Sequence, residues 1–191
     1  MEVDVIKFIS KFVELTDEEA GIIAEFDLIR KFKQHTVLLH EGVVSNECFL
    51  VLEGCLRSFY LIDGEEKTTE FFTENQIAMP VSYHTKSPSE YFISCLEDSI
   101  VCVGTIEKTQ ELLRKLPKLQ TIGHALNGEQ AVQNKMTFDR YKTLPPEVRY
   151  LKLLEERPAL CNRVSQYHIA SYLGIKPETL SRIRKRIMTQ K

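Results

Sequence analysis

The sequence predicts an α+β protein: an N-terminal antiparallel β domain, then a long helix, then a C-terminal pair of short helices. Three observations lead to this class. Residues 28–103 fall into short β-type segments at roughly 8–12-residue spacing. Residues 118–143 carry apolar side chains at helical spacing. Residues 165–191 contain two helical patterns separated by a turn at Gly174.

Two helices are expected before the β region. Residues 3–13 place apolar groups at helical spacing, which predicts the first. Thr16 with Glu19 three residues later is a capping-box pattern, which predicts a second helix through Phe26.

The β region is predicted to be an antiparallel sandwich or small barrel. Asp63-Gly64 is its clearest hairpin signal, because both residue types tolerate the positive φ of a two-residue turn. The predicted strands are LIRKFK, TVLLHEG, CFLVLEG, CLRSFYLID, EKTTEFF, YFISCLED and SIVCVG.

Helical patterns return at residues 107–116 and continue at 118–143. A helix of about 25 residues would span nearly 40 Å, more than a small barrel needs. We therefore expect its apolar seam to pair with a second copy of the chain, as in a coiled coil. The alternative, a helix lying on the barrel of its own subunit, stays open. The seam residues are Leu119, Ile122, Leu126 and Met136. Residues 147–157 form a further helix that Pro158 is expected to close.

The C-terminal pair has the packing pattern of a helix-turn-helix. Ala170 is small enough for close helix contact, Gly174 permits the turn, and Pro177 opens the second helix. Leu180, Ile183 and Ile187 then form its inward stripe. An ordinary helical hairpin with a solvated basic face is the alternative.

Charge is distributed unevenly along the chain. Residues 161–191 hold seven Lys or Arg residues and one acid, Glu178, whereas the first 160 residues hold 18 basic and 26 acidic residues. A basic end on an acidic body is typical of local binding to nucleic acid.

Composition excludes several classes. No run of about 18 apolar residues exists, so no membrane span is expected, and an N-terminus carrying acids does not resemble a signal peptide. We therefore expect a cytoplasmic protein. The five cysteines show no C-x-x-C spacing, so reduced thiols and no metal or cofactor are expected.

Two segments resemble the Crp/Fnr family of bacterial transcription regulators. TVLLHEG-x(6)-FLVLEGCLRSFYLIDGEE is similar to the family's glycine-punctuated β-roll, and KPETLSRI is similar to its recognition-helix motif. The resemblance implies a jelly-roll-like β-roll sensor domain at residues 1–116, a dimerisation helix at 117–143 and a helix-turn-helix domain at 144–191. It implies a homodimer on a pseudo-palindromic DNA operator, with RNA polymerase as a further partner and an unknown small-molecule effector or none.

The same resemblance implies which residues touch DNA. Glu178 and Arg182 would read bases, since a carboxylate accepts from cytosine and an Arg fork bonds guanine. A family base contact often falls at the position of Pro177, which has no polar side chain. The remaining expected DNA contacts, mostly to phosphates, are Ser165, Gln166, Tyr167, Lys176, Thr179, Ser181, Lys185 and Arg186.

The chain departs from the family pattern at three points. A nucleotide-binding member has Gly-Glu and then Arg-Ser or Arg-Thr. The corresponding stretch here, NQIAMPVSYHTKSPSEYFIS, contains no Gly-Glu, and Glu90-Tyr91 stands in place of the second pair. We therefore expect no tight cyclic AMP binding. An iron–sulfur cluster is not expected, because the first cysteine is Cys48. The chain also stops soon after the recognition helix, so the usual wing strand is expected to be missing.

Two other functions remain alternatives. The chain could be a sensor of this fold that signals by protein contact without binding DNA. A cupin-type metalloenzyme is the least favoured, because such a site needs His-x-His with a nearby Glu and another His. The five histidines, at positions 35, 40, 84, 124 and 168, do not follow that pattern.

Overall fold

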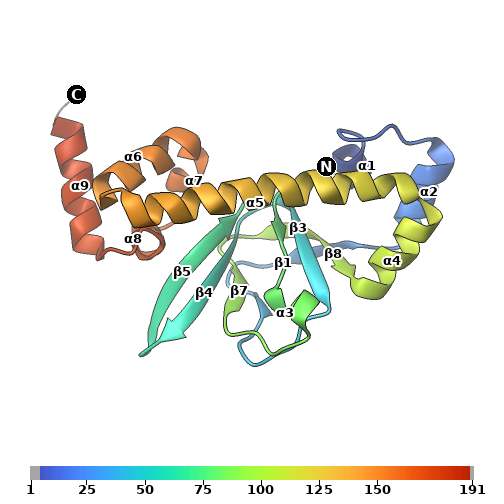
Figure 1. Cartoon of the computed structure of the whole chain (residues 1–191), viewed down its shortest axis with the longest axis horizontal. Helices are drawn as coiled ribbons and strands as arrows, with labels where there is room; N and C mark the ends of the chain where they lie inside the picture. The colour runs from blue at the N-terminus through green and yellow to red at the C-terminus, as the bar shows by residue number, and fades with distance from the viewer. Residues whose placement is uncertain (1–4, 190–191) are drawn as a thin grey trace. The chain divides into compact units, whose positions relative to one another are not determined.

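The computed structural model describes residues 5–189, apart from the side chain of Asn127 (Figure 1). The chain forms two compact units. The first comprises residues up to Arg57 together with residues 71–131, and the second comprises residues 58–70 and 132–191. Val3 and Asp4 of the first expected helix, and Gln190 and Lys191 of the basic end, lie outside the described residues. The division into three domains stays a prediction.

Two four-stranded sheets make up the β domain, in the orders β1-β8-β3-β6 and β2-β7-β4-β5. Strand β8 pairs antiparallel with both β1 and β3, and β2 pairs antiparallel with β7, which confirms the predicted antiparallel β domain. The strands are β1 (Ile29–Phe32), β2 (Val37–Leu39), β3 (Glu47–Glu53), β4 (Leu56–Ile62), β5 (Glu65–Phe72), β6 (Ile77–Ala78), β7 (Phe92–Cys95) and β8 (Ser99–Thr105). The sequence missed β6 and the short helix α3 (Val81–Thr85).

The core of the β domain draws apolar side chains from both sheets. Phe49, Val51 and Val101 come from the first sheet, and all are at most 1% exposed. Leu56 and Ile93 come from the second and are equally buried. Each exchanges water for apolar contact, worth roughly 1.5–3 kcal/mol per side chain, so this layer holds the two sheets together.

The N-terminal helices are α1 (Val5–Ile9) and α2 (Asp17–Glu25). The predicted capping box is confirmed: Thr16 Oγ1 accepts a hydrogen bond from the Glu19 backbone, and Glu19 accepts one from the Thr16 backbone at 2.8 Å. Lys118 at the start of the next helical segment donates to the Glu19 carboxylate at 2.5 Å. These bonds fix the start of α2 beside Lys118.

The seam prediction needs correcting here. Leu119 and Ile122 are 6% and 7% exposed and lie in one apolar cluster with Val5, Phe8 and Ile23. Leu126 is partly buried against the same cluster. The apolar stripe of this segment is therefore covered by the N-terminal helices of its own subunit. Met136 is exposed.

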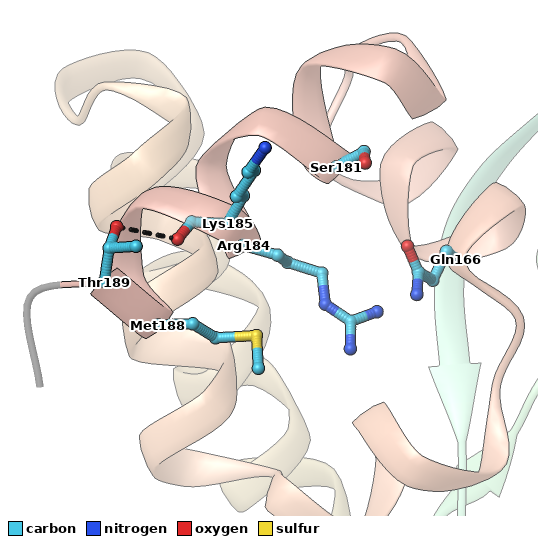
Figure 2. Close-up of a pocket in the computed structure, with 6 residues that line it drawn as sticks. All are labelled: Gln166, Ser181, Arg184, Lys185, Met188 and Thr189. Carbon is cyan, nitrogen blue, oxygen red and sulfur yellow. Dashed lines mark hydrogen bonds between the residues drawn. The ribbon is translucent and has the colours of Figure 1, made fainter.

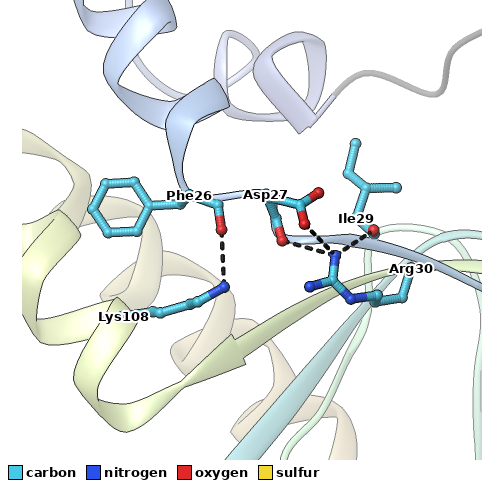
Figure 3. A network of polar contacts seen from close by, with 5 residues as sticks. All are labelled: Phe26, Asp27, Ile29, Arg30 and Lys108. Atoms are coloured by element: carbon cyan, nitrogen blue, oxygen red, sulfur yellow. Dashed lines mark hydrogen bonds and ion pairs between the residues drawn. The ribbon is translucent and has the colours of Figure 1, made fainter.

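A polar network fixes the turn from α2 into β1 (Figure 3). Arg30 Nη1 donates to the Asp27 backbone oxygen at 2.8 Å, to the Asp27 carboxylate at 3.1 Å and to the Ile29 oxygen at 2.9 Å. Lys108 Nζ donates to the Phe26 oxygen at 2.9 Å. Asp27 has a positive φ of 44°, and these bonds hold that turn conformation.

The helices after the β domain follow the predicted order with one addition. They are α4 (Ile106–Lys115), a 3-10 turn (Pro117–Leu119), α5 (Gln120–Thr143), α6 (Pro146–Glu156), α7 (Pro158–Arg163), α8 (Gln166–Tyr172) and α9 (Pro177–Thr189). Pro158 does not merely close α6, as predicted, but opens α7. Proline suits a first helical turn because its missing donor is not needed there.

In the second unit, α8 is attached to the β4–β5 hairpin through one hydroxyl. Ser171 Oγ donates to the Glu66 backbone oxygen at 2.9 Å and accepts from the Thr68 backbone nitrogen at 2.9 Å. Arg140 of α5 forms two hydrogen bonds to the Glu156 carboxylate, at 2.5 and 2.7 Å. These contacts position α8 and α6 within the unit.

Candidate nucleic-acid interface

The turn between α8 and α9 is set by three residues. Ser165 caps α8, its hydroxyl accepting from the His168 backbone nitrogen at 3.3 Å. Gly174 adopts a φ of 67°, which a residue with a Cβ atom rarely does. Pro177 is the first residue of α9. The predicted start of the second helix and the role of the glycine are therefore confirmed.

Aliphatic side chains join the two helices. Ala170 and Leu180 are fully buried, and Ile169, Leu173 and Ile183 are at most 4% exposed. Helices α8 and α9 pack against each other through this set. The arrangement is a helix-turn-helix, with α9 as the helix whose outer face remains free.

The outer face of α9 presents the predicted base-reading pair. Glu178 and Arg182 are both exposed, one helical turn apart, and Ser181 and Lys185 lie next to them. Arg182 Nε donates to the Glu178 backbone oxygen at 3.4 Å, which aligns the side chain along the helix. Leu180 and Ile183 point the other way, so their burial fixes the outward direction of Arg182.

The predicted phosphate contacts are not all equally available. Ser165, Gln166, Tyr167 and Lys176 are exposed, whereas Thr179 is half-buried. Arg186 differs from these, because its guanidinium bonds the Glu147 carboxylate of α6 at 3.0 Å. The structure therefore directs Arg186 toward α6.

A hollow of about 390 Å³ lies beside α9, and three of the predicted DNA contacts line it. They are Gln166, Ser181 and Lys185; the other lining residues are Arg184, Met188 and Thr189 (Figure 2). Arg184 was not among the predicted DNA contacts. Its position in the sequence could have indicated it, because Arg184 follows the predicted contact Ser181 by three residues and so lies on the same side of the helix.

The segment where a cyclic nucleotide would be sought is tied into the β domain. Val81 N at the start of α3 donates to the Tyr91 hydroxyl at 2.9 Å, and Ser45 N donates to the buried Ser82 hydroxyl at 3.2 Å. Glu90 is exposed beside Tyr91. A carboxylate thus stands in the place that the family pattern gives to an arginine.

Residues 5–189 contain neither a metal-binding cluster nor a membrane-spanning helix. No group of three or more His, Cys, Asp or Glu side chains there is placed to hold a metal ion. Among the same residues, every helix is too short or too polar to cross a bilayer.

Comparison with known proteins agrees with this architecture. The profile of the cyclic nucleotide-binding domain family matches residues 29–115. The nitrogen fixation regulation protein FixK of Rhizobium meliloti is 24% identical over 161 residues, which are 82% of this chain and 73% of FixK.

Solved structures share the fold at low sequence identity. FixK2 from Bradyrhizobium japonicum superposes with a TM-score of 0.71 at 15% identity, covering 85% of this chain and 84% of its own. A CooA mutant from Carboxydothermus hydrogenoformans gives a TM-score of 0.72 at 16% identity, covering 97% and 84%. The comparisons therefore show a cyclic nucleotide-binding domain over residues 29–115, and a fold shared with FixK2 and CooA over most of the chain.

Proposed function

We propose that this protein is a transcription regulator that binds double-stranded DNA through α9. The observation that carries the proposal is the outer face of that helix, where Glu178, Ser181, Arg182 and Lys185 are exposed while Leu180 and Ile183 are buried. Such a helix fits the major groove and offers both a carboxylate and a guanidinium to base edges. The name of FixK, a regulation protein, supports the same function.

The regulator acts as a homodimer on a pseudo-palindromic operator. Two recognition helices must lie about 34 Å apart to enter successive major grooves, which requires a second copy. Val132 and Met136, 58% and 41% exposed and one turn apart on α5, supply an apolar contact for that copy. They replace Leu119 and Ile122, which the first unit already buries.

Fluorescence anisotropy with duplexes selected from a randomised pool tests the DNA-binding proposal. We expect saturable binding whose affinity falls steeply with salt concentration, because each neutralised phosphate releases counterions. Binding without salt dependence, or none at all, would contradict the proposal and favour the alternative of a sensor that signals by protein contact.

The effector is a molecule other than cyclic AMP, or there is none. Support comes from the exposed Glu90 beside Tyr91, because a carboxylate repels the cyclic phosphate that an arginine would attract. We expect calorimetric titration with cyclic AMP and cyclic GMP to give no heat of tight binding. Micromolar affinity for either nucleotide would contradict the proposal.

A further inference from the structure

The basic side chains of α9 lie on different flanks of the helix. Ser181, Arg184 and Met188 recur at intervals of three and four residues, so they share one flank. Arg186 lies two positions beyond Arg184, on the opposite flank, and there it pairs with Glu147 of α6 at 3.0 Å. The two flanks therefore differ: one carries a cation already bound to an acid, and the other opens onto the hollow.

Among residues 5–189, Arg184 and Lys185 are the only charged side chains that line the hollow. Figure 2 shows the Arg184 guanidinium directed into it, between Gln166 on α8 and Met188. No carboxylate of the described residues contributes to the lining. The hollow is thus a positively charged surface with the amide of Gln166 and the hydroxyl of Ser181 as neutral polar groups.

These four polar side chains have no partner within residues 5–189. Neither a hydrogen bond nor an ion pair engages the side chains of Gln166, Ser181, Arg184 or Lys185 there. Thr189 differs, because its hydroxyl already donates to the Lys185 and Arg186 oxygens at 3.0 and 2.9 Å. Arg184 is half-buried, and partial burial of an unpaired charge costs solvation free energy. A bound anion would offset that cost.

The charge of Arg184 also acts on titratable groups of α6 and α7. Burial raises the pKa of the Tyr150 hydroxyl on α6 and of the Cys161 thiol on α7, and the Arg184 charge partly offsets both shifts. The Arg184 charge therefore acts on groups of both helices as well as on the hollow.

We infer that Arg184, with Gln166, Ser181 and Lys185, forms a binding site for a DNA backbone phosphate on this flank of the recognition helix. The inference rests on the proposed function and extends it to a residue outside the predicted set. An Arg fork can grip two oxygens of a phosphodiester, while Gln166 and Ser181 donate single hydrogen bonds. The contact carries no sequence information, because it reaches only the sugar–phosphate chain.

Removing the charge tests the site in the full-length protein. We expect Arg184→Gln to weaken binding of every duplex about tenfold. The slope of log affinity against log salt should become shallower by about one for each Arg184 removed, hence about two for a dimer. Sequence preference should stay unchanged. Anisotropy titrations over a salt series measure all three quantities, on the pool-selected duplex and on an unselected random duplex.

Two matched variants make the result specific. Arg114→Gln removes the same charge from an exposed position on α4 in the first unit and should leave the salt slope as in the wild type. Arg184→Lys keeps the charge and should restore the slope while recovering only part of the affinity, because an ammonium lacks the fork. Thermal unfolding of Arg184→Gln, Arg184→Lys and Arg114→Gln shows whether any variant is misfolded. A folded Arg184→Gln that binds DNA weakly has therefore lost a contact and not its structure.

The outcomes distinguish this inference from the proposed function. If Arg184→Gln keeps the wild-type slope of log affinity against log salt, Arg184 does not contact a phosphate. The proposed DNA-binding function is then unaffected. If it changes which sequences are preferred, Arg184 reads bases and the inference is equally wrong. If wild-type protein does not bind DNA, both fail together.

Discussion

Arg182 owes its position to its neighbours more than to its own contacts. Leu180 and Ile183 are at most 4% exposed, and on a helix these burials leave position 182 facing outward. Its one described hydrogen bond is to the Glu178 backbone at 3.4 Å, too long to hold it strongly. The guanidinium is therefore available to a base edge.

Arg182→Ala should relax sequence preference. A bidentate Arg–guanine contact contributes about 1–3 kcal/mol of discrimination, which this change removes at one position of each half-site. Lys185→Ala is the comparison and should weaken all duplexes alike. Selection from a randomised pool with each variant checks this, and unaltered preference after Arg182→Ala would mean that another residue reads the base.

Glu70 is the most strongly shifted carboxyl of the second unit. Burial raises its pKa from 4.5 to about 7, and the charge of Arg157 offsets only part of the shift. Between these two values the folded protein keeps a proton that the unfolded chain has released. The free energy of unfolding should therefore fall as pH rises from about 4.5 to about 7, and this contribution should stay constant above that range.

Glu70→Gln should remove this pH dependence. The amide cannot ionise, so above about pH 7 the variant should be more stable than the wild type by about 1–3 kcal/mol. Below pH 4.5 the two should agree. Urea unfolding across the pH range measures the difference, with the exposed Glu155→Gln as control. A wild type whose stability is flat over this range would contradict the assignment.

At the scale of elements, Gly174 decides how α8 leads into α9. A Cβ atom at this residue would lie 3.0 Å from the Tyr141 ring of α5, and its φ of 67° is left-handed. Tyr141 is itself fixed, with the Arg149 guanidinium 4.7 Å from its ring centre. A side chain here would therefore strain the turn and press against the Tyr141 ring.

Gly174→Ala should destabilise the protein by at least about 1–2 kcal/mol. Gly123→Ala is the matched control within α5: no atom lies within 4 Å of its added Cβ, and its φ is not positive. That change should stabilise the helix by roughly 0.5–1 kcal/mol. Chemical unfolding of both variants measures the contrast, and a neutral Gly174→Ala would show that α8 and α9 can join in another way.

Elements were predictable where local signals agree. The capping box at Thr16, the Asp63-Gly64 hairpin and the turn at Gly174 each combine a turn residue with a change of hydrophobic period, and all three are present. The missed elements β6, α3 and α7 have two, five and six residues. Segments so short cannot display a full period, so tertiary contacts decide their conformation.

The candidate site was predictable in kind but not in detail. Hydrophobic periodicity identified α9 and its outer face, because the spacing of apolar residues along the sequence determines which face of a helix is buried. The sequence did not show that Arg186 forms an ion pair, because its partner Glu147 lies 39 residues earlier in the chain. In the same way, the stripe of Leu119 and Ile122 was visible, but not that α1 and α2 cover it. A pattern shows that a face is apolar without showing what covers it.

At the scale of the whole molecule, assembly should depend on the exposed part of α5. Met136→Glu combined with Val132→Glu places charges on the proposed contact and should convert a dimer into monomers, with loss of tight operator binding. Val43→Glu, also on an exposed apolar residue but in the β domain, is the control. Sedimentation analysis measures the mass, and a variant that remains dimeric would place the contact elsewhere.

The two hydrogen bonds of Ser171 reach only main-chain atoms of the hairpin, at Glu66 and Thr68. Substitutions at Glu66 or Thr68 therefore leave both hydrogen bonds possible, because every residue has a backbone carbonyl and every residue except proline has a backbone N–H. These two hydrogen bonds are lost when Ser171 is replaced by a residue without a hydroxyl, or when a proline takes the place of Thr68. The side chains of this hairpin can therefore vary during evolution without breaking the two bonds that tie it to α8.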